Sequence, residues 1–238
     1  MWWIILISIL VPVIIIGIFV VVKIVSKKDH DYDDYDEHGG VHVGIDEKPS
    51  FPILANDQAG IVGENEVNNF LSFLLRSDEY LLTNLLLPLW NGEKTEIDCV
   101  LISRKGIFCI EIKHWVGHIS GNDEDESWLQ EYDDSYRKNK WHRNPVKQNN
   151  GHCVILKKKL NNRYWINNVV IFHDLEDGLG INSKYTYTAN EFGNYYSSLA
   201  DVIPENSLKV IYQKLEPYIA TPEELEKHRE WIKRKYND

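Results

Sequence analysis

The 238-residue chain has three cysteines, a single methionine and no internal repeat. The absence of a repeat excludes solenoid and propeller architectures, which are built from one unit stacked many times. Cys99, Cys109 and Cys153 are an odd number of cysteines, and each lies inside an apolar segment. We therefore expect reduced core residues, as in cytoplasmic proteins, rather than a disulfide scaffold.

Charge is also absent from the first 22 residues, in which Ile, Leu and Val dominate. As a helix this stretch would span about 33 Å, enough to cross a hydrocarbon core of about 30 Å. A cleaved signal peptide fits less well, because no basic region precedes the apolar run and no small-x-small site follows Val22. Lysines follow the run at positions 23, 27 and 28, which predicts a single-pass membrane protein with its soluble part in the cytoplasm.

The rest of the chain divides by composition. Residues 29–40 are acidic and show no apolar periodicity, so we expect a solvated tether and assign no site to the histidines in or beside it. The expected parts are a transmembrane helix at residues 1–25, an acidic flexible linker at 26–56, one core domain at 57–173 and a helical C-terminal extension, packed on that domain, at 174–238.

Three charges interrupt two apolar segments in the middle of the chain. Strands are expected at residues 96–102 and 107–113, joined by a tight turn, and they carry Asp98, Glu111 and Lys113. If the turn is symmetric, Asp98 faces Glu111. Because side chains alternate along a strand, Glu111 and Lys113 then share one face of the sheet, and Asp98 joins them there.

Two carboxylates about 5 Å apart repel each other by roughly 3 kcal/mol at an effective dielectric of 20, before any desolvation cost. A divalent cation between them reverses the sign of this interaction. Hard oxygen ligands with open positions suit Mg²⁺ or Mn²⁺, and a nearby lysine can orient or deprotonate an attacking water, which is the chemistry of phosphodiester hydrolysis. The structural alternative is that Glu111 and Lys113 form an edge-strand ion pair while Asp98 caps a turn. Apolar neighbours on both sides argue instead for a central strand.

Several motifs follow one another between about residues 57 and 173: Gly63-Glu64, Glu96-Ile97-Asp98, Gly106-Ile107-Phe108, the run from Ile110 to Gly117, and Asn144-Pro145 with Gln148 and His152. This set of motifs, in this order, resembles the nuclease-related domain family, NERD. The resemblance is much more specific than an isolated Glu-x-Lys, which is common by chance. The resemblance implies a restriction-endonuclease-like α/β fold of the PD-(D/E)xK superfamily, with a mixed sheet flanked by helices.

The resemblance also implies which residues form the site. The Asp98 and Glu111 carboxylates would bind Mg²⁺ or Mn²⁺ with help from the Ile112 carbonyl. The family often has His after the aspartate and Asn after the lysine, where this chain has Cys99 and His114. Neither departure removes a presumed metal ligand, so both bear on tuning of the site. The residues expected to be catalytic or to support catalysis are Asp98, Glu111, Lys113, Glu64 and Gln148.

Two helices are expected to carry the supporting residues. Apolar residues repeat at helical spacing over residues 57–76, and Glu64 projects from that apolar side, where a carboxylate requires a partner. Its alternative role is an N-terminal charge favoured by the helix dipole. A second helix is expected over residues 144–160, with Asn as N-cap and Pro at the first position. On it Gln148 faces either the metal site or solvent, and His152 contacts either substrate or solvent.

The remaining elements follow from periodicity and capping signals. The Asn91-Gly92 turn predicts that the strand before it and the two charged strands after it form an antiparallel meander. Residues 117–120 are expected to continue this sheet. The other expected elements are strands at 80–89 and 165–172 and helices after Thr188, over residues 204–215 and after Thr221. A helix that crosses between strands makes the domain α/β.

Basic residues gather between positions 135 and 173, although the whole chain has a formal net charge of −10. This segment contains no Asp or Glu, so it is a candidate track for phosphates. Trp141 and His142 lie among the basic residues and can stack on bases of a single strand. The alternative is a solvated helix face with a structural tryptophan. The expected nucleic-acid contacts are Lys138, Lys140, Trp141, Arg143 and Lys147.

The sequence thus predicts a membrane-anchored, metal-dependent nuclease on the cytoplasmic side that hydrolyses DNA or RNA. One alternative is a tethered module that keeps the fold and holds nucleic acid or protein at the membrane without cutting it. Another is an envelope-associated structural protein that works through its first and last helices. Dependence on a divalent ion separates the first hypothesis from the others.

Overall fold

The computed structural model describes residues 55–133, 136–173 and 180–237. The expected transmembrane helix and nearly all of the expected linker lie outside these residues. Within them, every helix is too short or too polar to span a bilayer.

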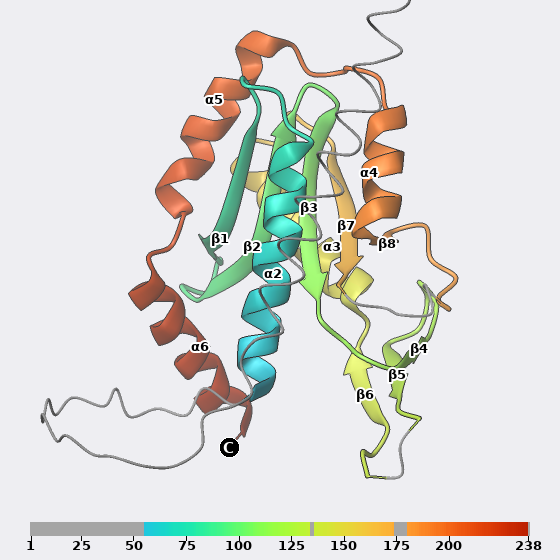
Figure 1. The fold of residues 1–238 in the computed structure, drawn as a ribbon. Coiled ribbons are helices and arrows are strands. Elements are labelled where there is room, and N and C mark those ends of the chain that lie inside the picture. Colours follow the sequence, from blue (N-terminus) through green and yellow to red (C-terminus); the bar gives the residue numbers. More distant parts are fainter. Residues whose placement is uncertain (1–54, 134–135, 174–179, 238) are drawn as a thin grey trace, which may run out of the picture. The chain divides into compact units, whose positions relative to one another are not determined.

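A five-stranded mixed sheet forms the centre of the fold (Figure 1). Strands β1, β2 and β3 form an antiparallel meander, whereas β7 pairs parallel to β3 and β8 pairs parallel to β7. The strand order is β1-β2-β3-β7-β8, with β1 at Tyr80–Pro88, β2 at Lys94–Ser103, β3 at Gly106–Lys113, β7 at Ile166–Phe172 and β8 at Thr186–Thr188. The expected α/β class, meander and central position of the charged strand β3 are confirmed.

Helices cover both faces of this sheet (Figure 1). Their bounds are Ala55–Phe73 for α2, Pro145–Lys159 for α3, Ala189–Ser198 for α4, Glu205–Leu215 for α5 and Pro222–Asn237 for α6, with a short 3-10 turn η1 at Glu216–Tyr218. One core joins α3 and α5 to sheet residues such as Val100 and Cys109. A second core joins α2 and α4 to Leu101 and Phe108. Alternate residues of β2 and β3 therefore enter opposite cores, as period-two alternation requires.

Side-chain caps fix the starts of the helices. The buried Asn144 side chain accepts hydrogen bonds from the backbone N–H groups of Val146 and Lys147, and Pro145 occupies the first turn of α3. Thr188 and Glu191 form a reciprocal capping box at α4. Both starts were expected from the sequence, because each cap is a local interaction.

A second sheet follows β3, and here the expectation for residues 117–120 is wrong. Strand β4 (His118–Ser120) does not extend the main sheet; it pairs with β5 (Ser127–Glu131), which pairs with β6 (Lys140–Arg143). The cause is Gly117, which has a φ of +91°. An added Cβ there would lie 2.2 Å from the Glu131 carbonyl oxygen, so only glycine allows the chain to turn out of the main sheet.

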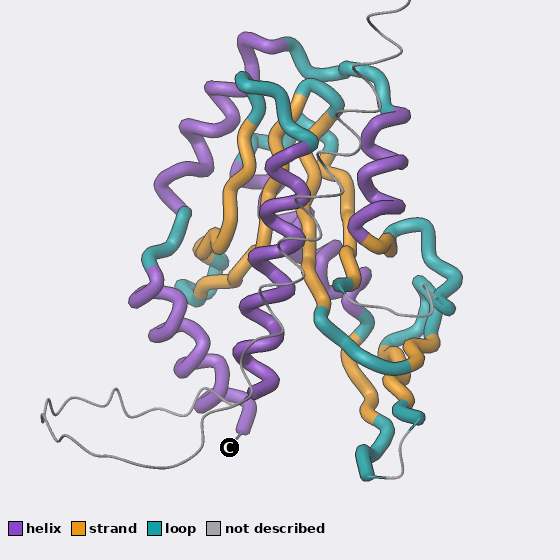
Figure 2. Tube along the Cα trace, viewed as in Figure 1, coloured by secondary structure: helices purple, strands orange, loops and turns teal. Residues whose placement is uncertain are grey.

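The segment after residue 180 belongs to the same fold. Strand β8 adds a fifth strand to the main sheet, which the sequence did not predict. Phe192 of α4 and Leu208, Ile211 and Leu215 of α5 are buried in the two cores. The tube in Figure 2 shows these helices lying along the sheet rather than apart from it.

Candidate functional site

Strands β2 and β3 bring Asp98 and Glu111 together. The hairpin pairs Ile102 with Ile107 and continues in register to Cys99 and Ile110, so the next position places Asp98 opposite Glu111. The Asp98 Oδ2 atom accepts a hydrogen bond of 2.8 Å from the Ile112 backbone N–H. Because the N–H and C=O of one strand residue point to the same side, the Ile112 carbonyl is also directed toward β2.

Glu111 is the centre of this cluster and is only 3% exposed. Its Oε1 atom accepts hydrogen bonds from Lys113 Nζ at 2.6 Å and from Gln148 Nε2 at 2.7 Å. Its buried Oε2 atom has no hydrogen-bond partner and lies 3.4 Å from Nδ1 of His152, which also lacks one. Lys113 comes from the same face of β3, and Gln148 and His152 come from successive turns of α3. His152 is therefore buried beside the carboxylate rather than exposed to solvent.

The charges of the cluster perturb one another. Burial, together with the neighbouring Glu111 carboxylate, raises the pKa of Asp98 well above its usual value. Burial alone would raise the pKa of Glu111 as well, but the Lys113 ammonium and His152 lower it to about 2. Burial opposes the charged form of Lys113, yet Glu111 and Asp98 raise its pKa. The site thus holds a charged lysine between one ionised carboxylate and one that is hard to ionise.

Two further charges reach the site from helices. Glu64 of α2 has its pKa raised by burial and by Glu96 and Glu111, while Arg229 of α6 lowers it. The Arg229 guanidinium donates to Glu96 at 2.7 Å, and its positive charge also acts on Glu64 and Asp98. Arg229 was not predicted from the sequence. Its helix has few apolar residues, and no local pattern shows which strand residue Arg229 contacts.

The sequence model of the nuclease-related domain, NERD, matches residues 59–173. Residues 59–173 are a NERD domain. Asp98, Glu111, Lys113, Glu64 and Gln148 all lie inside the match, whereas Arg229 lies outside it.

Relatives add little about activity. An uncharacterized protein of Bacillus anthracis is 33% identical over 93 residues, which cover 39% of this chain and 42% of that protein. The chain therefore spans less than half the length of this relative. No solved structure matches the chain.

The side chains of the NERD domain fit a divalent cation. Glu111 keeps one buried carboxylate oxygen without a hydrogen-bond partner, and Asp98 places a second hard oxygen donor across the hairpin. The described residues contain no cluster of three or more His, Cys, Asp or Glu side chains arranged as metal ligands. A cation would therefore complete its coordination with the Ile112 carbonyl and with water or substrate oxygens, as Mg²⁺ commonly does.

The expected nucleic-acid contacts of the NERD domain do not form one track. Trp141 is 71% exposed, and alternation along β6 places it with Arg143 on one face and Lys140 with His142 on the other. Lys138 is exposed just before β6. Lys147 lies on α3, where its ammonium binds the Glu126 carboxylate and the Glu124 carbonyl.

One of these faces is linked to the carboxylate cluster. His142 stacks on Trp115 with ring centroids 4.2 Å apart, and Lys113 Nζ lies 5.9 Å from the Trp115 ring centroid. Burial lowers the pKa of His142, and the positive charges of Lys140 and Lys113 lower it further. Lys140 and His142 therefore lie on the side of the small sheet that is next to the site.

Proposed function

We propose that the NERD domain is a metal-dependent nuclease that hydrolyses phosphodiester bonds of DNA or RNA. The observation that carries the proposal is the buried Glu111 carboxylate beside Asp98 and Lys113, one oxygen of which lacks a hydrogen-bond partner and lies 3.4 Å from His152 Nδ1. Folding alone does not favour such a group in a central strand, because a buried unpaired acceptor costs about 1–3 kcal/mol. A ligand that uses this oxygen explains why it is there.

The residues take distinct roles in this proposal. Asp98, Glu111 and the Ile112 carbonyl would hold Mg²⁺ or Mn²⁺. When bound, such a cation supplies an activated water and neutralises charge on the phosphate. In the metal-free protein the Glu111 and Asp98 carboxylates raise the pKa of Lys113 against the effect of burial. This lysine would orient water or a phosphate oxygen. Gln148 fixes the Glu111 carboxylate through its hydrogen bond of 2.7 Å.

Glu64 and Arg229 would act at the edge of the site. Glu64 would add negative charge that favours the cation, which agrees with its electrostatic interaction with Glu111 and Lys113. Arg229 would balance Glu64 and Glu96 when no cation is bound. Lys140, on the near side of the small sheet, would contact a phosphate of the substrate.

Cleavage assays test this proposal. A soluble protein of residues 41–238 should nick plasmid DNA or cut RNA with Mg²⁺ and should lose that activity with EDTA. Asp98→Ala and Lys113→Ala should each lower the rate by at least about a hundredfold, the scale of removing one catalytic group. Lys158→Ala, on an exposed turn of α3, is the matched control and should cut like wild type. Equal activity of Asp98→Ala and wild type would refute the assignment.

The same assays separate the proposal from a module that only binds. Such a module would hold nucleic acid equally well with and without chelator, and metal would not raise its melting temperature.

We also propose that the domain is tethered to a membrane by residues 1–25, with the domain in the cytoplasm. Its support is the charge-free run of 22 residues followed by lysines. The full-length protein should stay in the membrane pellet after washing at pH 11, whereas residues 41–238 should stay in the supernatant. Release of the full-length protein by the alkaline wash would contradict the tether.

A further inference from the structure

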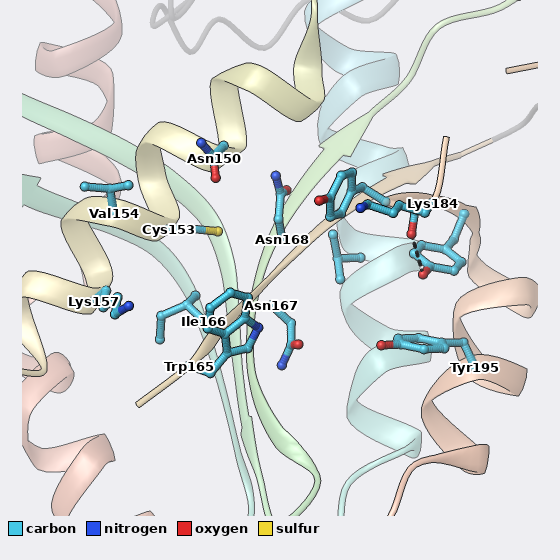
Figure 3. Close-up of a pocket in the computed structure, with 13 residues that line it drawn as sticks. Asn150, Cys153, Val154, Lys157, Trp165, Ile166, Asn167, Asn168, Lys184 and Tyr195 are labelled. Carbon is cyan, nitrogen blue, oxygen red and sulfur yellow. Dashed lines mark hydrogen bonds between the residues drawn. The ribbon is translucent and has the colours of Figure 1, made fainter. Parts of the chain in front are cut away.

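A second concave region lies away from the carboxylate cluster. It is a groove with a volume of about 460 Å³, bounded by α3, by the first half of β7 and by the segment from Lys184 to α4 (Figure 3). Its size falls in the range of small-ligand sites. The residues that it takes from the segment after position 180 lie outside the NERD match. The groove is therefore built jointly by the NERD domain and by the segment that follows it.

The groove is open because the sheet ends unevenly. Strand β8 pairs only with Val170–Phe172, so in the described part of the chain residues 166–169 have no strand neighbour on that side. Trp165 precedes this open stretch and is 75% exposed. A tryptophan usually buries most of its large ring, so a ring left open beside a groove is available for a partner.

Aromatic rings line much of the groove. Trp165 lies on one side and Tyr195 on the other (Figure 3), and Tyr185 and Tyr187 also line the groove. The rings of Tyr187 and Tyr195 are stacked, with centroids 5.3 Å apart and an interplanar angle of 17°. Flat rings on both sides of an open groove are the arrangement on which successive bases of a single strand stack.

Positive charge accompanies the rings. Lys157 Nζ lies 5.5 Å from the Trp165 ring centroid, and Lys184 Nζ lies 5.0 Å from that of Tyr185. No Asp or Glu lines the groove, and neither lysine forms an ion pair with any acidic residue in the part of the chain that the structure describes. In a protein with a formal net charge of −10, this local excess of positive charge marks a site for an anion.

We propose that this groove binds single-stranded nucleic acid, with bases on Trp165 and the tyrosines and phosphates near Lys157 and Lys184. The inference deepens the proposed function, because it assigns a strand-holding surface to the same molecule. It does not need the metal site, since every group that contacts the strand belongs to the groove. Helix α3 carries residues of both places: Gln148 contacts Glu111, and Lys157 lines the groove.

Binding without metal tests the inference. Fluorescein-labelled dT12 and rU12 are titrated with the full-length protein in a mild non-ionic detergent and EDTA, and anisotropy is measured. Trp165→Ala should weaken binding by roughly five- to a hundredfold, the scale of losing one stacked base. The double variant Lys157→Ala/Lys184→Ala should reduce the slope of log Kd against log salt by about 1.4, because two phosphate contacts are lost.

Matched controls come from exposed residues outside the groove. Lys158 is exposed and adjacent to Lys157 but does not line the groove, and Trp90 is 97% exposed at the β1–β2 turn. Lys158→Ala and Trp90→Ala should bind both oligonucleotides like wild type. A 12-base-pair duplex should compete poorly, because its bases are already stacked. Melting temperatures equal to wild type show that the groove variants are folded.

The outcomes distinguish this inference from the nuclease proposal. If Trp165→Ala and the lysine double variant bind like their controls, the groove proposal is overturned. Equal competition by the duplex also overturns it. If the groove variants lose binding while wild type never cuts with Mg²⁺, the groove proposal stands and the nuclease proposal fails.

Discussion

The Asp98 carboxyl makes the metal-free protein less stable than it could be. It faces the ionised Glu111 carboxylate, and burial together with Glu111 raises its pKa well above the usual value. An acid whose pKa is raised by folding binds its proton more tightly in the folded state. Its penalty is therefore absent below the unfolded pKa of about 4 and grows as the pH rises toward the folded pKa.

We predict that Asp98→Asn raises the melting temperature of the metal-free protein by a few degrees at pH 8. The asparagine oxygen can still accept the Ile112 N–H hydrogen bond, and the repulsion from Glu111 is removed. The difference between variant and wild type should shrink as the pH falls toward 4. Thermal melts in EDTA across this range measure it, and a variant that is less stable at pH 8 would show that Asp98 has a structural role.

At the scale of single residues, the sequence predicted which side chains of neighbouring strands lie together in the site. Asp98, Glu111 and Lys113 follow from a two-residue turn and from alternation, both of which are local. Gln148 was left open between the site and solvent, and the structure places it on Glu111. Arg229 was not predicted, because its contact with Glu96 joins residues 133 positions apart.

At the scale of elements, Asn144 joins α3 to the acidic loop before β5. Its side-chain oxygen caps α3, and its Nδ2 atom donates to the backbone carbonyl of Asp125 at 2.8 Å. The sequence predicted the cap from the Asn-Pro pair. The contact with the loop could not be predicted, because nothing near Asn144 in the sequence identifies residues about twenty positions earlier.

We predict that Asn144→Ala lowers the free energy of unfolding by at least about 2 kcal/mol, since it removes a buried helix cap and the hydrogen bond to the half-buried Asp125 carbonyl. Thr188→Ala removes only an exposed cap and should cost about 1 kcal/mol. Urea denaturation of both variants provides the comparison. Equal losses would mean that the loop contact contributes nothing.

Elements themselves were predicted unevenly. The long strands and helices were found because each has enough apolar repeats to show its period. Strands β5, β6 and β8 were missed and β4 was assigned to the wrong sheet, since each of these strands has five residues or fewer and is too short to show a pattern. Gly117 was the available signal for the second error, because a positive φ there redirects the chain.

At the scale of the molecule, the NERD match ends at residue 173, whereas the cores continue beyond it. Phe192 and Tyr196 complete one core, and Leu208, Ile211 and Leu215 complete the other. We predict that residues 52–173 alone do not fold cooperatively. Removal of these side chains would expose the apolar sheet surface that they cover. Circular dichroism during a thermal melt tests this. A sharp transition equal to that of residues 52–238 would contradict it.

Stabilisation by metal is the most direct test of the claim that Asp98 and Glu111 share a divalent cation. Residues 41–238 and the Asp98→Asn variant are melted in EDTA and with Mg²⁺ or Mn²⁺ at a hundred times the dissociation constant. Wild type should gain about 2.7 kcal/mol, seen as a higher melting temperature, and the variant should gain little. A wild-type melting temperature that neither ion changes would contradict the account.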